Sequence, residues 1–575
     1  MLALVCAALL TATACADVPL RTQPQVISDD EGAATDAGPA VAPPDKDLSA
    51  EQTVRKFITA NAQAANDYEA SRLYLDPKAA REWRPNKDVV IMPDHYNATV
   101  PPDTTQPEDP NEAIVRVRGP RLGSLGPDNA FIPGGRPVET EIKLRRQRDD
   151  KQWRIVDPPD DVITTEPDFI ANYYQVPLYF FAPQSNVRVP DPRFVLAEPK
   201  ESLPVRVVEL LLEGPSNALA KAVSNPLEKA TLDTNPTVKP GGLLEVPLTG
   251  VAQEDAEKRQ LMVAQLVMSL ETVSVDRVRP LSDGRTLVAG HQDWRNGDFP
   301  STNATMSADL TGMALKDGRL VSLEDAEPVP GPAGTGAYQV RSAAQSLDGG
   351  LLAVVERAGK RAGIRVGPVD GDLASIDLRA GRLTRPTWRP AVAGSKQSNE
   401  VWTVVDSKKV ARIALAADNV WKAQTVNVSA LDGFGPMTAL RLSRDGTRAV
   451  IVADKKVVVA SVVRTSDSVL LRAPRILQPD TLTDVVDVDW LSQEWLVAAT
   501  SSASRPVVKL PVDGFGYERY SLSNLELPLR GITAAPDRPV VAANPGGLWE
   551  ASLPSEVWRQ RSLSQSSLSS PFYPG

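Results

Sequence analysis

The chain has 575 residues, with 63 Lys or Arg against 72 Asp or Glu, so its net charge is −9. Its hydrophobic fraction of 42% is ordinary for a globular protein, and its length predicts about three or four domains. The acidic balance argues against nucleic acid as a main partner. After the opening residues no stretch of about 20 positions is apolar throughout, so none predicts a membrane-spanning helix.

The chain opens with the apolar run MLALVCAALL, which is typical of the central region of a secretory signal peptide and too short to span a bilayer. The basic residues that normally precede such a run are absent, since the first is Arg21. We therefore expect a signal peptide over residues 1–14 whose basic start is truncated.

The segment ATAC, which ends at Cys15, resembles the lipobox of bacterial lipoproteins, with Ala12 where that motif usually has Leu. The resemblance implies cleavage before Cys15 and an N-palmitoyl, S-diacylglycerol cysteine as the lipidation site. The only other cysteine, Cys6, lies within the expected signal peptide. More than one acyl chain makes anchoring stable, so we expect a lipid-anchored protein on the extracytoplasmic face of the cell membrane.

Residues 15–47 follow as a lipidated cysteine and an acidic stretch rich in Ala, Pro, Asp and Gly, which predicts a flexible tether. Order is expected from 48 to 168. Ser49 and Gln52 have the spacing of a capping box, so a helix should begin there, and four long strand patterns follow. Helices followed by antiparallel strands predict an α+β domain, and their order resembles the NTF2-like fold.

Residues 169–300 predict a second unit. It combines the strand VPLYFFAP, a helix that ends in LLEGP and a later helix that ends in VMSLETVSVDRV. Gly214 and Pro215 are typical helix-ending residues. This combination resembles the GerMN domain, an α/β fold.

Residues 301–340 are expected to hold a connector and the first propeller strands, and residues 341–575 the rest of a β-propeller. Polar turns followed by short apolar strands recur there, with 97 residues from Asp348 to Asp445 and 92 from Asp445 to Asp537. Trp388 and Trp490 fall near the midpoints, which gives a period of about 45–50 residues. We expect five or six blades, and hairpin turns at the Asp-Gly pairs.

The chemistry-bearing residues do not form a recognisable catalytic motif. There are two histidines, His95 and His291, for which surface or turn positions are expected. The carboxylate clusters DPPDD (157–161) and DVVDVDW (484–490) leave a glycosidase or Ca²⁺ site open, although a loop and a strand explain them better. The tryptophans of the propeller segment could form a binding rim, but core packing is favoured: Trp388, Trp490, Trp495 and Trp549. We expect no enzyme activity, cofactor or metal.

Together, the lipobox, tether, two mixed domains and propeller resemble the LpqB family of actinobacterial lipoproteins. The resemblance implies a non-enzymatic accessory of a two-component sensor histidine kinase of the MtrB type, in cell-envelope homeostasis and division. The implied partners are the extracytoplasmic domain of that kinase and, through the lipid, the membrane. The alternative is a cell-wall glycan-binding or glycan-cleaving protein that uses the propeller face.

Overall fold

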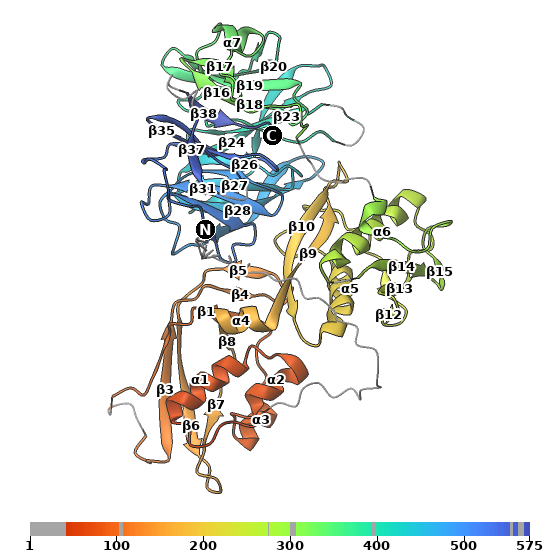
Figure 1. The fold of residues 1–575 in the computed structure, drawn as a ribbon, viewed down its shortest axis with the longest axis vertical. Helices are drawn as coiled ribbons and strands as arrows, with labels where there is room; N and C mark the ends of the chain where they lie inside the picture. The colour runs from red at the N-terminus through yellow and green to blue at the C-terminus, as the bar shows by residue number, and fades with distance from the viewer. Residues whose placement is uncertain are drawn as a thin grey trace, which may run out of the picture.

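The structure is a computed structural model that describes residues 42–575, apart from 103–106, 274, 300–305, 393–394, 396, 553–555 and 562–567. The expected signal peptide, Cys15 and most of the tether lie outside the described residues. In the part of the chain that the structure describes, no helix has the length and apolar character needed to cross a membrane. Three folded units follow one another along the chain (Figure 1).

The first unit is the expected α+β domain. Ser49 and Gln52 form the predicted capping box at the start of α1. The elements are α1 (Ala50–Ala60), α2 (Ala65–Arg72), α3 (Pro77–Glu82), β1 (Val89–Met92), β2 (Asn97–Thr99), β3 (Glu112–Gly119), β4 (Gly123–Leu125), β5 (Phe131–Pro133), β6 (Val138–Arg146), β7 (Trp153–Asp157), β8 (Val162–Thr165) and α4 (Glu166–Asn172). They form two sheets, ordered β2-β3-β6-β7 and β5-β4-β1-β8.

The core of this domain lies between α1 and the long antiparallel strands. Val54, Phe57 and Ile58 recur at helical spacing and are buried. They join a cluster with inward-facing residues of β3, β6 and β7, among them Val115 and Ile142. The core of the domain is therefore built from the apolar face of α1 and the inward-facing residues of the strands.

The second unit begins with a long antiparallel hairpin of β9 (Tyr173–Phe181) and β10 (Arg188–Leu196), called here the docking hairpin. Two helices and a sheet of mostly short strands complete this unit. The elements are α5 (Leu203–Glu213), β11 (Thr231–Leu232), β12 (Thr237–Lys239), β13 (Leu243–Thr249), α6 (Ala256–Leu270), β14 (Arg277–Ser282) and β15 (Arg285–Thr286). Gly214 follows α5 with φ 97°, as its helix-ending role predicts.

Helix α6 differs from an ordinary amphipathic helix because residues 262–270 are all buried. One set of its side chains joins the main core of the domain with Val207 and Leu244. Ala264 and Met268 instead pack against Tyr179 and Phe181 of the docking hairpin. The helix is therefore enclosed between the sheet and the hairpin, which makes the hairpin part of this domain's core.

The third unit is a propeller of six sheets within the described residues. Blades 2 to 6 each have four antiparallel strands in chain order. They are β18 to β21 (Val340–Gln345, Leu351–Ala358, Arg361–Pro368, Ala374–Ser375), β22 to β25 (Thr387–Trp388, Glu400–Val405, Lys409–Leu415, Trp421–Val426), β26 to β29 (Met437–Leu442, Arg448–Ala453, Lys456–Arg464, Val469–Leu477), β30 to β33 (Val485–Trp490, Trp495–Thr500, Val507–Pro511, Glu518–Arg519) and β34 to β37 (Gly531–Thr533, Val540–Asn544, Gly547–Ala551, Trp558–Gln560).

Blade 1 joins two distant parts of the chain. Its strands β16 (Met313–Lys316) and β17 (Arg319–Ser322) pair with β38 (Ser569–Phe572) in the order β17-β16-β38. The first propeller strands therefore lie within the 301–340 segment. Because β38 completes this sheet, the ring closes without leaving a long unpaired edge between its first and last strands.

The repeat predicted from the sequence corresponds to alternate blades. Asp348, Asp445 and Asp537 lie in the turns between the first and second strands of blades 2, 4 and 6. Trp388 and Trp490 lie on the inner strands of blades 3 and 5, and both are buried. One interval of about 95 residues thus spans two blades.

Candidate functional site

The lipidation site predicted from the sequence, Cys15, lies outside the described residues. The candidate catalytic clusters lie within them. In DPPDD, Asp157 ends β7 and pairs with Lys143 at 2.9 Å. Asp161 accepts a hydrogen bond from the side chain of Asn86 at 2.9 Å. The cluster is the loop that leaves β7, as expected.

DVVDVDW forms the inner strand β30 of blade 5, and its two strand-centre carboxylates are bonded to arginines. Asp487 accepts from Arg441 at 3.1 Å, and Asp489 accepts from Arg385 at 2.7 Å. Burial by itself raises the pKa of Asp489, but the neighbouring guanidinium groups outweigh it and the pKa is lowered. A carboxylate held ionised by a fixed arginine is a poor general acid, so this pair suits a structural role.

The propeller tryptophans mainly pack inside the fold. Trp388 and Trp490 are 1% exposed and Trp549 is 6% exposed. The indoles of Trp388 and Trp490 donate to carbonyl oxygens of neighbouring blades, Ala344 and Arg441. Trp495 is half-buried, and the Lys509 ammonium lies 4.3 Å from its ring centroid. These positions fit packing between blades rather than an aromatic rim.

His95 and His291 are both exposed, and His291 stacks on Trp294 with a centroid distance of 4.0 Å. Over the residues that the structure describes, no group of three or more His, Cys, Asp or Glu side chains is placed to hold a metal ion. Asp445 and Gly446 form a hairpin turn in which the carboxylate bonds Ser443 and Thr447.

Two other regions bring polar side chains together. The first is the junction where the docking hairpin meets blades 4 and 5. Arg448 donates to the carbonyl of Pro190, and Gln493 donates to that of Arg188 at 2.8 Å. The phenol of Tyr179 donates to Glu494 at 3.0 Å. These bonds attach the second domain to the propeller.

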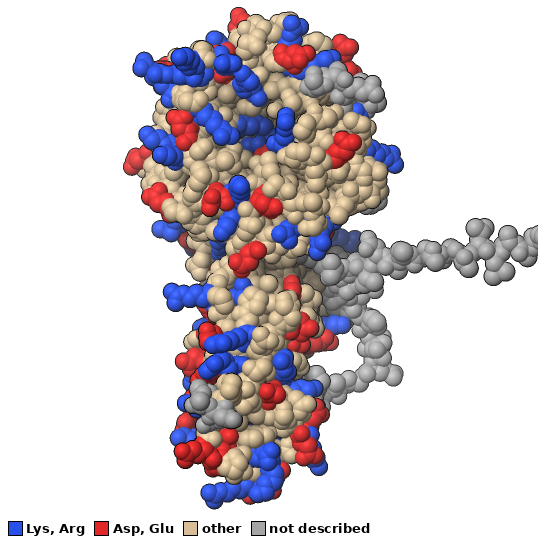
Figure 2. Space-filling view, turned by 90° about the vertical axis from the view of Figure 1, so that its left-hand side faces the viewer, with Lys and Arg blue, Asp and Glu red and all other residues tan. Residues whose placement is uncertain are grey.

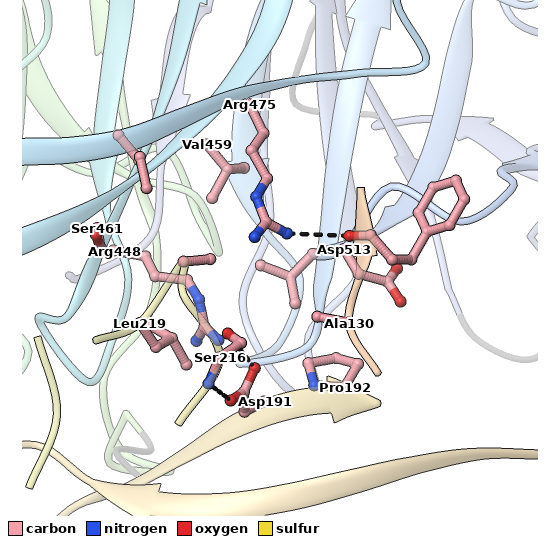
Figure 3. A pocket seen from close by; sticks show the side chains of 15 residues that line it. Ala130, Asp191, Pro192, Ser216, Leu219, Arg448, Val459, Ser461, Arg475 and Asp513 are labelled. Atoms are coloured by element: carbon pink, nitrogen blue, oxygen red, sulfur yellow. Dashed lines mark hydrogen bonds between the residues drawn. The ribbon is translucent and has the colours of Figure 1, made fainter. Parts of the chain in front are cut away.

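A buried ion pair organises the hairpin beside this junction, and Figure 3 shows its carboxylate, Asp191, hydrogen-bonded to Ser216. Asp191 and Arg193 are 3% and 1% exposed, and their side chains are 2.7 Å apart. The amide and hydroxyl of Ser216 also donate to Asp191. Burial by itself raises the pKa of Asp191, but these donors lower it below its usual value. The cavity beside it has a volume of about 40 Å³, so it suits a packed interface better than a ligand site.

The first domain reaches the propeller through an aromatic cluster. Phe515, in the turn after β32, lies against Phe131, Phe169 and Phe194 with centroid distances of 5.1, 5.6 and 5.0 Å. Arg475 of β29 donates to the carbonyl of Phe131 at 3.0 Å. All three units therefore meet around blades 4 and 5.

The second region is the channel mouth, defined by residues of the inner strands and of the segments just before them: Ser342, Arg385, Arg441, Asp487, Arg530 to Ile532 and Ser569 to Pro571. Every blade contributes to this list through its inner strand or the residues just before it. The hollow has a volume of about 430 Å³. Figure 2 shows a hollow in the middle of the propeller with Lys or Arg atoms inside it.

Sequence reasoning identified the aspartates of this region but not the arginines. Burial, together with the neighbouring Arg385, lowers the pKa of Arg441 to about 10, while Asp487 opposes the shift. Arg441 therefore remains charged at neutral pH. The only available signal was an arginine inside the otherwise apolar strand TALRL, which precedes the turn at Asp445.

The described residues define a class of three-domain proteins in which two mixed α/β units are joined to a six-bladed propeller. Family models match in the same order: "Lipoprotein LpqB, N-terminal domain" over 43–170, "Sporulation and spore germination" (Germane) over 177–288, and "Lipoprotein LpqB beta-propeller domain" over 318–574. The chain belongs to the LpqB lipoprotein family.

Relatives match over nearly the whole chain. Lipoprotein LpqB of Rhodococcus jostii is 30% identical over 565 residues, covering 94% of this chain and 91% of its own length. That of Nocardia farcinica is 30% identical and that of Mycobacterium tuberculosis 28% identical, and both are covered to 92%. Among solved structures, TolB from Acinetobacter baumannii matches 46% of this chain and 66% of its own, with 13% identity and a TM-score of 0.32.

Proposed function

We propose that this protein is a lipid-anchored extracytoplasmic accessory, without chemistry of its own, of an MtrB-type sensor histidine kinase that acts in cell-envelope homeostasis and division. The observation that carries the proposal is that the candidate catalytic side chains form ion pairs or pack inside the fold. Asp487 and Asp489 are bonded to arginines of other blades, and three of the four tryptophans considered for a binding rim are buried. The family match over 94% of the chain supports the lipoprotein part of the proposal.

In this proposal the anchor is Cys15, acylated after cleavage of residues 1–14. The first element of the folded part begins at Ala50. A flexible chain of 30 or so residues spans roughly 30 Å, so the folded units would remain close to the membrane and search for a partner in two dimensions. Replacing Cys15 with Ala should move the protein out of the firmly membrane-bound fraction, and unchanged membrane retention would contradict the anchor.

The channel-mouth face is the proposed docking surface. The docking hairpin occupies the turns at the other ends of the inner strands, such as 443–447 and 491–494. The mouth is lined by residues of the inner strands and of the segments just before them. Leu527 lies three residues before Arg530 in the connection to blade 6 and is 41% exposed, so this connection offers an apolar side chain to a partner.

The test is recovery of the tethered protein from membranes after chemical crosslinking. We expect the extracytoplasmic domain of a sensor kinase among the recovered partners, and its absence with the crosslinker present would contradict the proposal. The same protein incubated with purified peptidoglycan should be neither retained nor able to release fragments. Retention or release would favour the glycan alternative instead.

A further inference from the structure

The channel mouth has more fixed positive charge than the chain itself neutralises. The charged residues that line it are Arg385, Arg441, Arg530 and Asp487. A second carboxylate, Asp489, bonds Arg385 from behind the lining. Three guanidinium groups thus share two carboxylates within the described residues. One positive charge is therefore left without a carboxylate partner.

Arg385 lines the hollow. Its guanidinium donates to Asp489 at 2.7 Å and to the carbonyl oxygens of Ile532 and Pro571 at 3.5 and 3.2 Å. The Arg385 side chain therefore links blade 3 to blades 5, 6 and 1. Arg444 of blade 4 donates to the carbonyl of Pro574 at 2.6 Å. These bonds link the blades to one another and hold the Arg385 guanidinium in place.

Arg441 also lines the hollow and is held by Asp487 at 3.1 Å. The carboxylate of Asp487 also accepts from the amides of Val488 at 3.0 Å and Ile532 at 3.2 Å. Both oxygens of Asp487 therefore accept hydrogen bonds that fix its orientation. The Nε of Arg441 is buried and has no hydrogen-bond partner among the described residues, so this guanidinium is incompletely satisfied.

Arg530 stands at the rim, just before the inner strand of blade 6. It is exposed, and no carboxylate of the described residues lies within ion-pair distance of its guanidinium. The next residue, Gly531, has no side chain, and a Cβ there would lie 3.4 Å from the Asp487 carboxylate. Because Gly531 has no side chain, the space between Arg530 and Asp487 is not filled at this position.

We propose that the channel mouth binds a small molecule through an oxyanion group, either a phosphate ester or a carboxylate. Guanidinium groups recognise both groups through paired N–H donors. A hollow of about 430 Å³ lies within the size range of small-molecule sites. Arg385 and Arg441 bind with little loss of side-chain entropy because Asp489 and Asp487 already hold them in place. This site does not depend on the identity of the kinase partner.

The experiment measures binding of inorganic phosphate and of glucuronate to the purified whole chain in detergent, by calorimetry at low ionic strength. Glucuronate carries a sugar carboxylate, so the two probes distinguish the two sources of the oxyanion. The variants are Arg530→Ala and Arg530→Lys. The matched control is Arg519→Ala, which removes an exposed arginine from the outer strand β33 of blade 5.

We expect saturable binding of at least one probe and about tenfold weaker binding by the Arg530→Ala variant, since a bond to a charged group is lost. Arg530→Lys keeps the charge but loses the paired donors, so its affinity should lie between those of the wild type and Arg530→Ala. Arg519→Ala should equal the wild type, and added salt should weaken binding. Absence of binding by both probes would overturn the proposal. Equal affinity in the wild type and Arg530→Ala would overturn it as well.

Discussion

The junction and the channel mouth of the propeller use arginine differently. At the junction, Arg448 and Arg475 donate to backbone carbonyls of the docking hairpin and of β5. At the channel mouth, Arg530 has no carboxylate among the described residues within ion-pair distance. Arginine side chains thus join two domains where the other domain supplies an acceptor. Arg530 has no such acceptor and remains available for binding.

Acid should break the internal ion pairs that stabilise the docking hairpin and the propeller. Three buried carboxylates have lowered pKa values although burial alone raises them, because arginines bond to them: Asp191, Glu400 and Asp489. A lowered folded-state pKa means that the ionised form stabilises the fold. This contribution is present above the unfolded pKa of about 4 and is lost as pH falls below it.

We therefore expect a melting temperature that is steady from about pH 8 to 5 and falls steeply below about pH 4, measured by circular dichroism. A melting temperature that is unchanged between pH 6 and pH 3 would contradict this role of the carboxylates.

The Asp191→Asn substitution should destabilise the junction without affecting the channel mouth. The substitution leaves Arg193 buried without its carboxylate, and losing one partner of a buried pair costs about 3–5 kcal/mol of stability. Denaturant unfolding measures the loss. Glu139→Gln is the control, because the Arg118–Glu139 pair has side chains that are 54% and 63% exposed and should contribute little. Equal losses of stability in the two variants would contradict a larger contribution of the buried Asp191–Arg193 pair.

Phe515→Ala should loosen the contact between the first domain and the propeller. Phe515 is half-buried among aromatic rings of the first two units, so we expect a loss of about 2 kcal/mol, below that of a fully buried phenylalanine. Small-angle scattering should show a larger radius of gyration. Phe434→Ala, a half-buried residue that packs within the blade 3 and 4 core, should reduce stability without that expansion.

Arg530→Ala should have the smallest effect on stability, within about 0.5 kcal/mol of the wild type, because an exposed side chain without an ion-pair partner is removed. Arg441→Ala should be markedly more destabilising, since Asp487 then loses its arginine. Thermal melting of the two variants sharpens the comparison. If Arg530→Ala were as destabilising as Arg441→Ala, the mouth would be a structural region like the junction.

Features with local signals were predictable. Ser49 and Gln52 are three residues apart and specify the helix start. Asp348, Asp445 and Asp537 specify turns, so their spacing revealed the propeller. Trp388 and Trp490 were correctly placed in its core.

Features that depend on contacts between distant residues were not predictable. Arg441 and Asp487 are 46 positions apart, and Arg448 reaches Pro190 over 258 positions. An arginine in an apolar strand signals that an acceptor must exist, but neither its spacing nor its neighbours say which residue supplies it. Closure of blade 1 by β38 is likewise a long-range pairing, which left the blade count open at five or six.

Docking of a membrane sensor kinase on the channel-mouth face is tested most directly by a photo-crosslinking amino acid at position 527, three residues before Arg530, in the lipid-anchored protein in its native membrane. Val238 of β12, which is 50% exposed, provides the matched position on the second domain. We expect an MtrB-type kinase to be captured from position 527 and much less from position 238. Absence of the kinase from the position 527 adducts, with the protein present in the membrane fraction, would contradict docking on this face.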